Sequence, residues 1–160
     1  MAGTTWIAFV GSVRRFLFIA AVAFWLGGFT FYAGVVFHVG ARALGSHMKQ
    51  GFITQRVTDW LNIAGAAALP IMLWNLAAIW RVRGRMFRFA LAASWGIMLL
   101  VQVELFALHP FMDRLLDARA RGVFDYDRFE SLHFAYITSS TVQWTAGLIH
   151  VWCSMAGTQV

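Results

Sequence analysis

Four apolar stretches separated by short charged connections dominate the hydropathy pattern of this chain. They cover about residues 16–38, 60–80, 89–108 and 133–153. Each is close to the ~20 residues that a helix needs to cross a bilayer. Short connections favour antiparallel neighbours. The pattern therefore predicts an all-α integral membrane four-helix bundle with up-down-up-down topology, built as a single transmembrane domain over residues 1–160.

The last apolar stretch carries a regular polar stripe. Six small or polar residues follow one another there at a 3-4-3-4-3 spacing: His133, Tyr136, Ser140, Gln143, Gly147 and His150. This spacing places all six on one side of a helix, which we expect to begin at Asp127, with Glu130 completing a capping box. Lipid cannot satisfy polar groups, so the stripe should face other helices. It either binds those helices by hydrogen bonds or lines a pathway for a small solute or ion.

The composition supports a membrane protein and argues against a nucleic-acid partner. The chain is 60% hydrophobic and 12% charged, and it contains eight Trp and fifteen Phe. Aromatic residues in such numbers are typical of membrane interfaces, so the expected partner is the lipid bilayer. The lone cysteine, Cys153, excludes an internal disulfide and a multi-cysteine zinc site.

Basic residues predict the orientation of the bundle. One side of the predicted membrane carries six arginines and no acidic residue: Arg14, Arg15, Arg81, Arg83, Arg85 and Arg88. The other side carries seven Lys or Arg together with most of the acidic residues. Dense basic flanks remain on the cytoplasmic side. We therefore expect a multi-pass protein of the cell (cytoplasmic) membrane with both termini in the cytoplasm.

Glu104 is the single acidic residue inside a predicted span. A carboxylate in the membrane is energetically expensive and suggests a functional site by default. Glu104 is either an ion or proton site or a structural acceptor of hydrogen bonds from the last helix. In the first case the predicted pathway comprises Glu104, Tyr136, Ser140, Gln143 and His150; in the second, Tyr136, Ser140 or Gln143 would donate to it.

Three histidines fall at the same predicted outer membrane face: His38, His109 and His133. Imidazole with a nearby carboxylate suits a transition metal such as zinc, iron or copper. A b-type haem between His133 and either His38 or His109 is the alternative cofactor, and ordinary interface histidines are the third interpretation. No CxxCH, HxxxH, HExxH, phosphate-loop or nucleophile-elbow motif occurs, so no enzymatic activity is predicted.

Three short motifs carry a family resemblance. They are Trp25-Leu26-Gly27-Gly28 in the first span, Leu108-His109-Pro110 at the exit of the third, and Phe129-Glu130-Ser131-Leu132-His133 before the fourth. With these motifs the chain resembles the transmembrane-protein-205-like family, a four-span membrane domain of unknown function. The resemblance covers most of the chain and implies the same four-span fold. It matches Pro110 and His133 to family positions.

Three functions remain open from the sequence. The first is binding or transport of a small solute or ion along the stripe. The second is a metal- or haem-binding membrane protein that uses the three histidines. The third is a structural accessory subunit of a larger membrane complex, whose aromatic surface covers partner helices. A bundle of this size has little interior, so we expect a transporter to form a homo-oligomer.

Overall fold

The computed structural model describes residues 2–117 and 122–156 and is almost entirely helical. Its elements follow in the order α1 (Ala2–Phe31), the π-helical η1 (Tyr32–Val36), α2 (Phe37–Leu44), α3 (His47–Ile79), the 3₁₀ turn η2 (Trp80–Val82), α4 (Arg85–Leu115), the two-residue strands β1 (Leu116–Asp117) and β2 (Gly122–Val123), and α5 (Tyr126–Met155). The two strands pair antiparallel. The prediction of an all-helical chain built on four long helices is thus confirmed, apart from this small strand pair.

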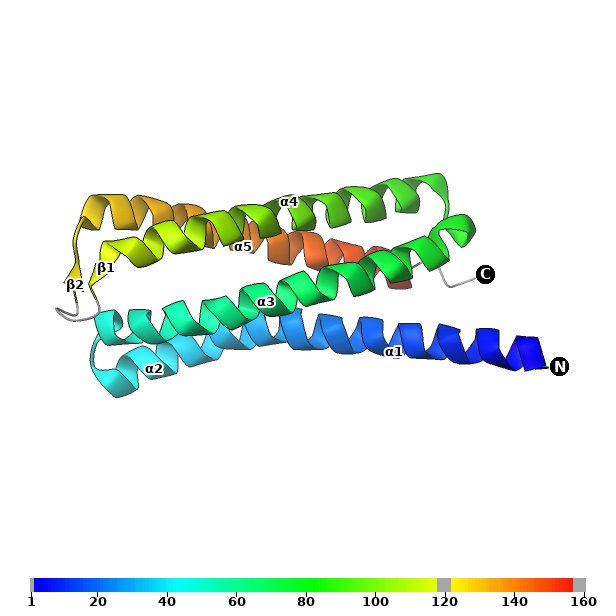
Figure 1. Ribbon diagram of the computed structural model, residues 1–160, viewed down its shortest axis with the longest axis horizontal. Coiled ribbons are helices and arrows are strands. Elements are labelled where there is room, and N and C mark those ends of the chain that lie inside the picture. The colour runs from blue at the N-terminus through cyan, green and yellow to red at the C-terminus, as the bar shows by residue number, and fades with distance from the viewer. Residues whose placement is uncertain (1, 118–121, 157–160) are drawn as a thin grey trace.

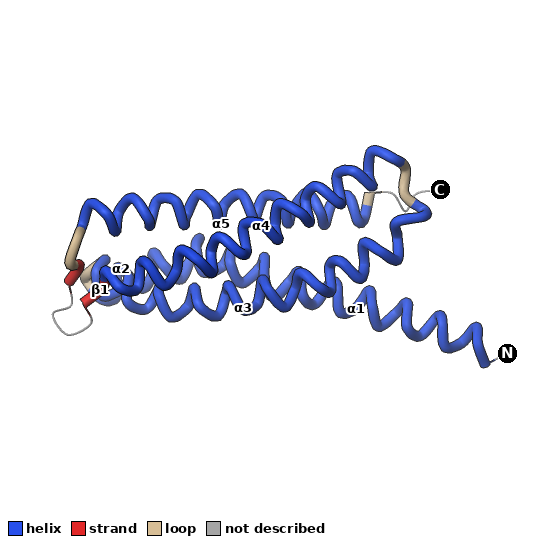
Figure 2. Tube along the Cα trace, turned by 45° about the horizontal axis from the view of Figure 1, so that its top comes forward, coloured by secondary structure: helices blue, strands red, loops and turns tan. Residues whose placement is uncertain are grey.

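The long helices lie side by side in one elongated bundle (Figure 1). The segments α1, η1 and α2 form one continuous rod that packs along α3, and α4 packs along both α3 and α5. Helix α5 meets α1 over a shorter length. Figures 1 and 2 both show that the first turns of α1 extend past the other helices.

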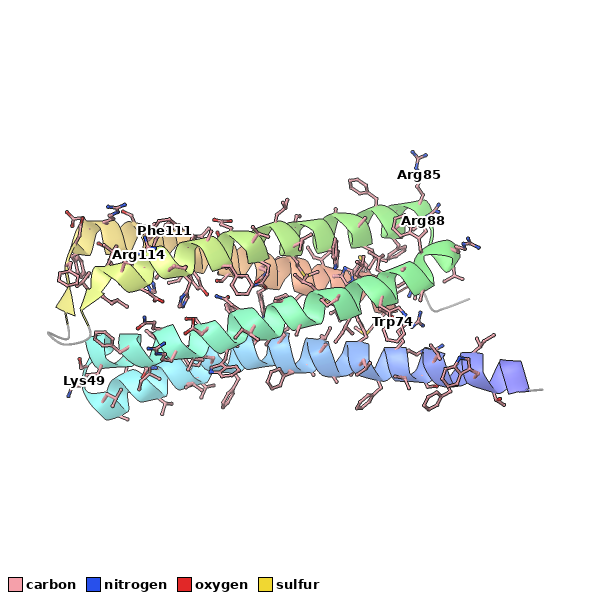
Figure 3. All side chains as sticks on the ribbon, in the orientation of Figure 1. Lys49, Trp74, Arg85, Arg88, Phe111 and Arg114 are labelled. Atoms are coloured by element: carbon pink, nitrogen blue, oxygen red, sulfur yellow. The ribbon has the colours of Figure 1, made fainter. Side chains whose placement is uncertain are left out.

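Charge divides the molecule into two ends. We call the end with η2 the arginine end, because Arg14, Arg15, Arg81, Arg83, Arg85 and Arg88 belong to it. The opposite end, with the β1–β2 pair, is the hairpin end. Figure 3 shows Arg85 and Arg88 at the arginine end and Lys49 and Arg114 at the hairpin end. None of the seven Asp and Glu residues belongs to the segments 1–58 and 60–103, which contain all six arginines of the arginine end.

Three of the four long helices are long and apolar enough to cross a membrane. They are the segments Thr5–Leu44, Lys49–Val82 and Arg85–Leu115. Helix α5 is as long as the others, but Ser, Thr, Gln and His in its sequence lower its mean hydropathy. Many large apolar side chains point outward, among them Phe24, Trp60, Phe89 and Leu100. Such a surface suits lipid better than water.

The helices extend beyond the predicted apolar spans. Helix α3 begins at His47, where the Ser46 hydroxyl accepts a hydrogen bond from the Lys49 amide at 3.3 Å. Helix α5 begins at Tyr126, because the Asp125 side chain caps it by accepting from the Arg128 amide at 3.1 Å. The expected cap at Asp127 is therefore wrong. The expected end of the third span at Pro110 is also wrong, since α4 continues through this proline to Leu115.

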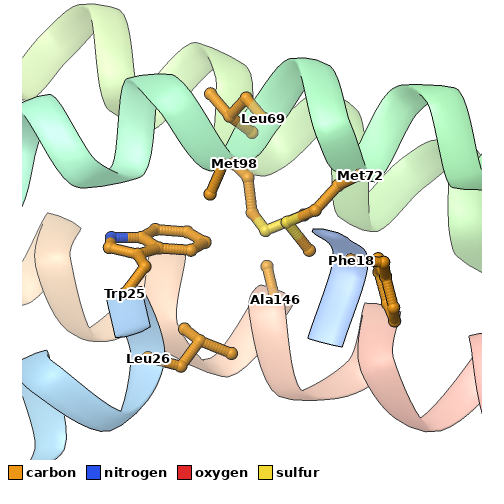
Figure 4. Close-up of a cluster of buried hydrophobic side chains, with 8 residues drawn as sticks. Phe18, Trp25, Leu26, Leu69, Met72, Met98 and Ala146 are labelled. Carbon is orange, nitrogen blue, oxygen red and sulfur yellow. The ribbon is translucent and has the colours of Figure 1, made fainter. Parts of the chain in front are cut away.

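An apolar cluster from all four long helices fills the middle of the bundle (Figure 4). Its labelled members are Phe18, Trp25 and Leu26 from α1, Leu69 and Met72 from α3, Met98 from α4 and Ala146 from α5. Met72 and Met98 are fully buried. Apolar side chains thus fill the centre of the bundle. The buried polar side chains lie on either side of this cluster along the helices.

Candidate ligand cavity and the buried polar stripe

The polar stripe of α5 faces the other helices, as its spacing predicts. Tyr136, Ser140, Gln143, Gly147 and His150 are all buried. His133, one turn nearer the hairpin end, is half-buried. The close contact of α5 with α1 depends on Gly147, because a Cβ atom there would lie 2.9 Å from a Leu26 methyl group.

Most of the stripe's hydrogen bonds connect three helices. The Gln143 amide donates to the Met98 carbonyl at 3.1 Å and to Gln102 Oε1 at 3.0 Å. The Gln102 amide donates to the Asn62 carbonyl at 3.2 Å, and the Tyr136 hydroxyl donates to Asn62 Oδ1 at 3.0 Å. Bonds of this kind hold helices together where water is absent. We call Asn62, Gln102, Tyr136 and Gln143 the amide network.

His150 lies apart from this network. Its Nδ1 atom is 3.1 Å from the Ser94 hydroxyl, and its fully buried Nε2 atom has no hydrogen-bond partner among the described residues. Ala146, a member of the central apolar cluster, lies between His150 and Gln143 along α5. The polar stripe is therefore interrupted by apolar packing.

Glu104 lies on the outer surface of the bundle and not in the stripe. It is exposed and accepts a hydrogen bond from the Ser139 hydroxyl at 2.8 Å. Tyr136 and Gln143, two of its three expected donors, donate into the amide network instead. Glu104 thus connects α4 to α5 on the surface that a lipid would contact, and the structure does not bring it together with the other predicted pathway residues.

The three candidate metal-binding histidines do not converge. His38 is exposed, and its ring lies edge-on to Phe37. His133 stacks on Phe129 with ring centroids 5.7 Å apart, and its buried Nδ1 atom has no partner in the described part of the chain. His109 is buried on α4. Within residues 2–117 and 122–156, no three His, Cys, Asp or Glu side chains are close enough to hold a metal ion.

His109 instead belongs to an acidic cluster between α3 and α4. Its Nδ1 atom lies 3.2 Å from Asp113 and 3.4 Å from Asp59, and its Nε2 atom lies 3.2 Å from the Thr58 hydroxyl. The Gln55 amide donates to the other Asp113 oxygen at 2.7 Å. The Asp59 carboxylate also lies 3.9 Å from the Arg56 guanidinium, so Asp113 is the carboxylate of this cluster without a Lys or Arg partner in the described part of the chain. We call His109, Asp59 and Asp113 the acidic cluster.

Neither carboxylate of this cluster is among the site residues predicted from the sequence. Asp113 follows His109 by four residues, the spacing that puts two side chains on one helix face. That spacing is visible in the sequence, but a helix expected to end at Pro110 leaves Asp113 outside it. Asp59 lay just outside a predicted span, and only the pairing of α3 with α4 brings it to His109.

A cavity of about 550 Å³ opens beside the acidic cluster at the hairpin end. Its wall includes residues from the α1–η1–α2 rod, from α3, α4 and α5, and from both strands. Aromatic rings form much of it, including Phe29, Tyr32, Phe52 and Phe129. The polar side chains on the wall include Gln55, Thr58, His109, Asp113, His133 and Tyr136. The described lining contains the Asp113 carboxylate and no Lys or Arg.

This geometry makes the cavity a candidate site for a small molecule. Ligand cavities of 300–1,000 Å³ are usually apolar with a few convergent polar groups. Here the carboxylate and the aromatic faces both favour a positive charge, since a cation over an aromatic ring is stabilised by the ring's quadrupole.

Searches with the chain against protein-family models, curated proteins and solved structures find no match.

Proposed function

We propose that this chain is an integral membrane protein that binds a small organic cation with an apolar body in the cavity at the hairpin end. The observation that carries the proposal is the cavity itself, which combines aromatic walls with the Asp113 carboxylate and has no Lys or Arg on its described lining. The ammonium group would lie near the acidic cluster, and the apolar body would lie against the aromatic rings.

Membrane insertion is supported by the three apolar helices and by the exposed apolar surface. We infer that α5 forms the fourth span, since its polar stripe is buried and its remaining faces are apolar enough to meet lipid. The four spans would then alternate in direction across the bilayer. With six arginines and no acidic residue, the arginine end would face the cytoplasm, so both termini lie there and the cavity opens on the opposite side.

Binding is favoured over a continuous pathway for ions. The amides of the network donate to each other and to backbone carbonyls, so few of their polar atoms remain for a passing solute. The central apolar cluster then separates this network from His150. A transport cycle would need the helices to separate, whereas ligand binding in the cavity needs no change in the bundle.

A matched set of three probes tests the predicted ligand chemistry. We would measure binding of 4-phenylbutylamine, 4-phenylbutanol and 4-phenylbutyrate to the protein in lipid nanodiscs, because the three share an apolar body and differ in charge. The amine should bind most tightly. Asp113→Asn should weaken amine binding about tenfold, the loss expected from removing a charged partner, and should leave the alcohol nearly unaffected.

Two control variants make this test specific. Glu104→Gln removes a carboxylate from the outer surface, so amine binding should be unchanged. Gly51 lines the cavity and Gly34 does not, and a Cβ atom at either position meets nothing within 4 Å. Gly51→Leu should therefore reduce the binding of all probes, while Gly34→Leu should not. Preference for the carboxylate probe, or equal effects of Asp113→Asn and Glu104→Gln, would contradict the proposal.

A further inference from the structure

A second groove lies at the arginine end, between the first turns of α1 and the last turns of α3. Its wall contains Ile7, Val10, Gly11, Arg14 and Arg15 from α1, with Trp74 and Ala78 from α3. Trp74 is 42% exposed, so the groove opens on the side of the bundle. Figure 3 shows Trp74 between the α1 and α3 ribbons near this end. The groove is far from the cavity of the proposed function, because it lies at the opposite end of the helices.

The Arg14 guanidinium lacks an anion in this groove. Its Nε atom is out of reach of solvent and has no hydrogen-bond partner in the described part of the chain. Arg15 adjoins it on the same wall. Residues 1–58 and 60–103, which include both walls of the groove, contain no Asp or Glu. Two guanidinium charges on one wall, with no Asp or Glu on either wall of the groove, would stabilise an external oxyanion there.

We propose that this groove binds the phosphate of an anionic phospholipid. Arginine presents several N–H donors in a planar fork that matches phosphate oxygens. Basic pockets between membrane helices on the cytoplasmic side are known to suit anionic head groups. The apolar part of the wall, Ile7, Val10 and Trp74, fits the glycerol and first acyl carbons, which a free phosphate ion lacks. The inference rests on the proposed membrane location but not on the ligand of the cavity.

Lipid retention in native mass spectrometry tests the groove. The intact protein is reconstituted in nanodiscs that contain phosphatidylglycerol and phosphatidylcholine in equal amounts, and the lipids that stay bound after release are counted. Phosphatidylglycerol should be enriched on the unmodified protein. Arg14→Gln should reduce that enrichment about tenfold, since charge-assisted hydrogen bonds are lost.

Two further variants separate a defined site from general attraction to a positive surface. Arg85→Gln removes the same charge from an exposed position at the same end and should keep the enrichment. Gly11→Leu keeps every charge but fills the groove, because a Cβ atom at Gly11 meets nothing within 4 Å, and it should abolish the enrichment. The midpoint of thermal unfolding of each variant should match that of the parent, which shows that the fold is retained.

Three results would overturn this inference. Equal losses with Arg14→Gln and Arg85→Gln would mean that the net charge of this end attracts lipid without a site. Unchanged enrichment in Gly11→Leu would place the lipid elsewhere. In nanodiscs of phosphatidylcholine alone, binding of inorganic phosphate that depends on Arg14, without phosphatidylglycerol enrichment in the mixed discs, would assign the groove to free phosphate. Failure of the protein to enter nanodiscs would instead count against the membrane location itself.

Discussion

At the scale of single residues, the polar side chains inside this bundle fall into two kinds. Those of the amide network have protein partners, which gives them a structural role. On the cavity wall, which Tyr136 of this network also lines, the Nδ1 atom of His133 has no partner among the described residues and retains bonding capacity. His109 lies at the border of the two groups, because its imidazole contacts Asp113 and its ring meets Tyr136 edge-on with centroids 6.0 Å apart.

Removing one hydroxyl from the amide network should destabilise the protein. Tyr136→Phe leaves Asn62 Oδ1 without its donor, so the free energy of unfolding should fall by about 1 kcal/mol. Tyr126→Phe is the matched control, since Tyr126 is 63% exposed, and it should change the value by less than ~0.5 kcal/mol. Reversible unfolding in mixed micelles measures both. Equal values for the two variants would show that the buried hydroxyl contributes nothing specific.

At the scale of helices, the sequence predicts the apolar middle of each element better than its ends. Hydropathy detects a span but not the polar turns that extend it, so α3 starts well before the apolar stretch that marks it. Pro110 illustrates the second difficulty. A proline removes one backbone donor and often ends a helix, yet α4 continues through it because packing on α3 and α5 outweighs that loss.

The close packing of α3 against its neighbours depends on Gly65. A Cβ atom there would lie 2.5 Å from Gln102 Oε1 and 2.8 Å from Trp25 Nε1. Gly65→Ala should therefore push Gln102 out of the amide network and lower the free energy of unfolding by about 1–3 kcal/mol. Gly96→Ala is the control, because its Cβ atom meets nothing within 4 Å, and it should be neutral or stabilising by up to ~1 kcal/mol. A neutral Gly65→Ala would mean that this contact is loose.

At the scale of the whole molecule, the sequence predicts the class of fold but not the site. The 3-4-3-4-3 stripe identifies the buried face of α5, since its period alone determines which side chains share a face. The cavity was not predictable in this way, because it depends on which helices are neighbours and where they diverge. The sequence suggests His109 as a metal ligand. Its contact with Asp113 follows from their i, i+4 spacing on α4, whereas its contact with Asp59 follows from the pairing of α3 with α4.

The distribution of charge connects the two proposed binding sites to the membrane. The net charge of +6 equals the charge of the six arginines at one end, since the rest of the sequence has seven basic and seven acidic residues. An end that attracts anionic head groups thus lies opposite an end whose cavity favours a cation. This polarity predicts that the cavity faces away from the cytoplasm. The resemblance to the transmembrane-protein-205-like family remains a prediction from the sequence.

Accessibility of two introduced cysteines tests this arrangement most directly. Phe124→Cys places a thiol at the hairpin end and Arg85→Cys places one at the arginine end, both at exposed positions. The native Cys153 is buried, so the parent protein is the blank. A membrane-impermeant maleimide added to intact cells should label position 124 at once and position 85 only after permeabilisation. Labelling of both positions from the same side, or of position 85 alone, would contradict a bundle that spans the membrane with its cavity on the outer face.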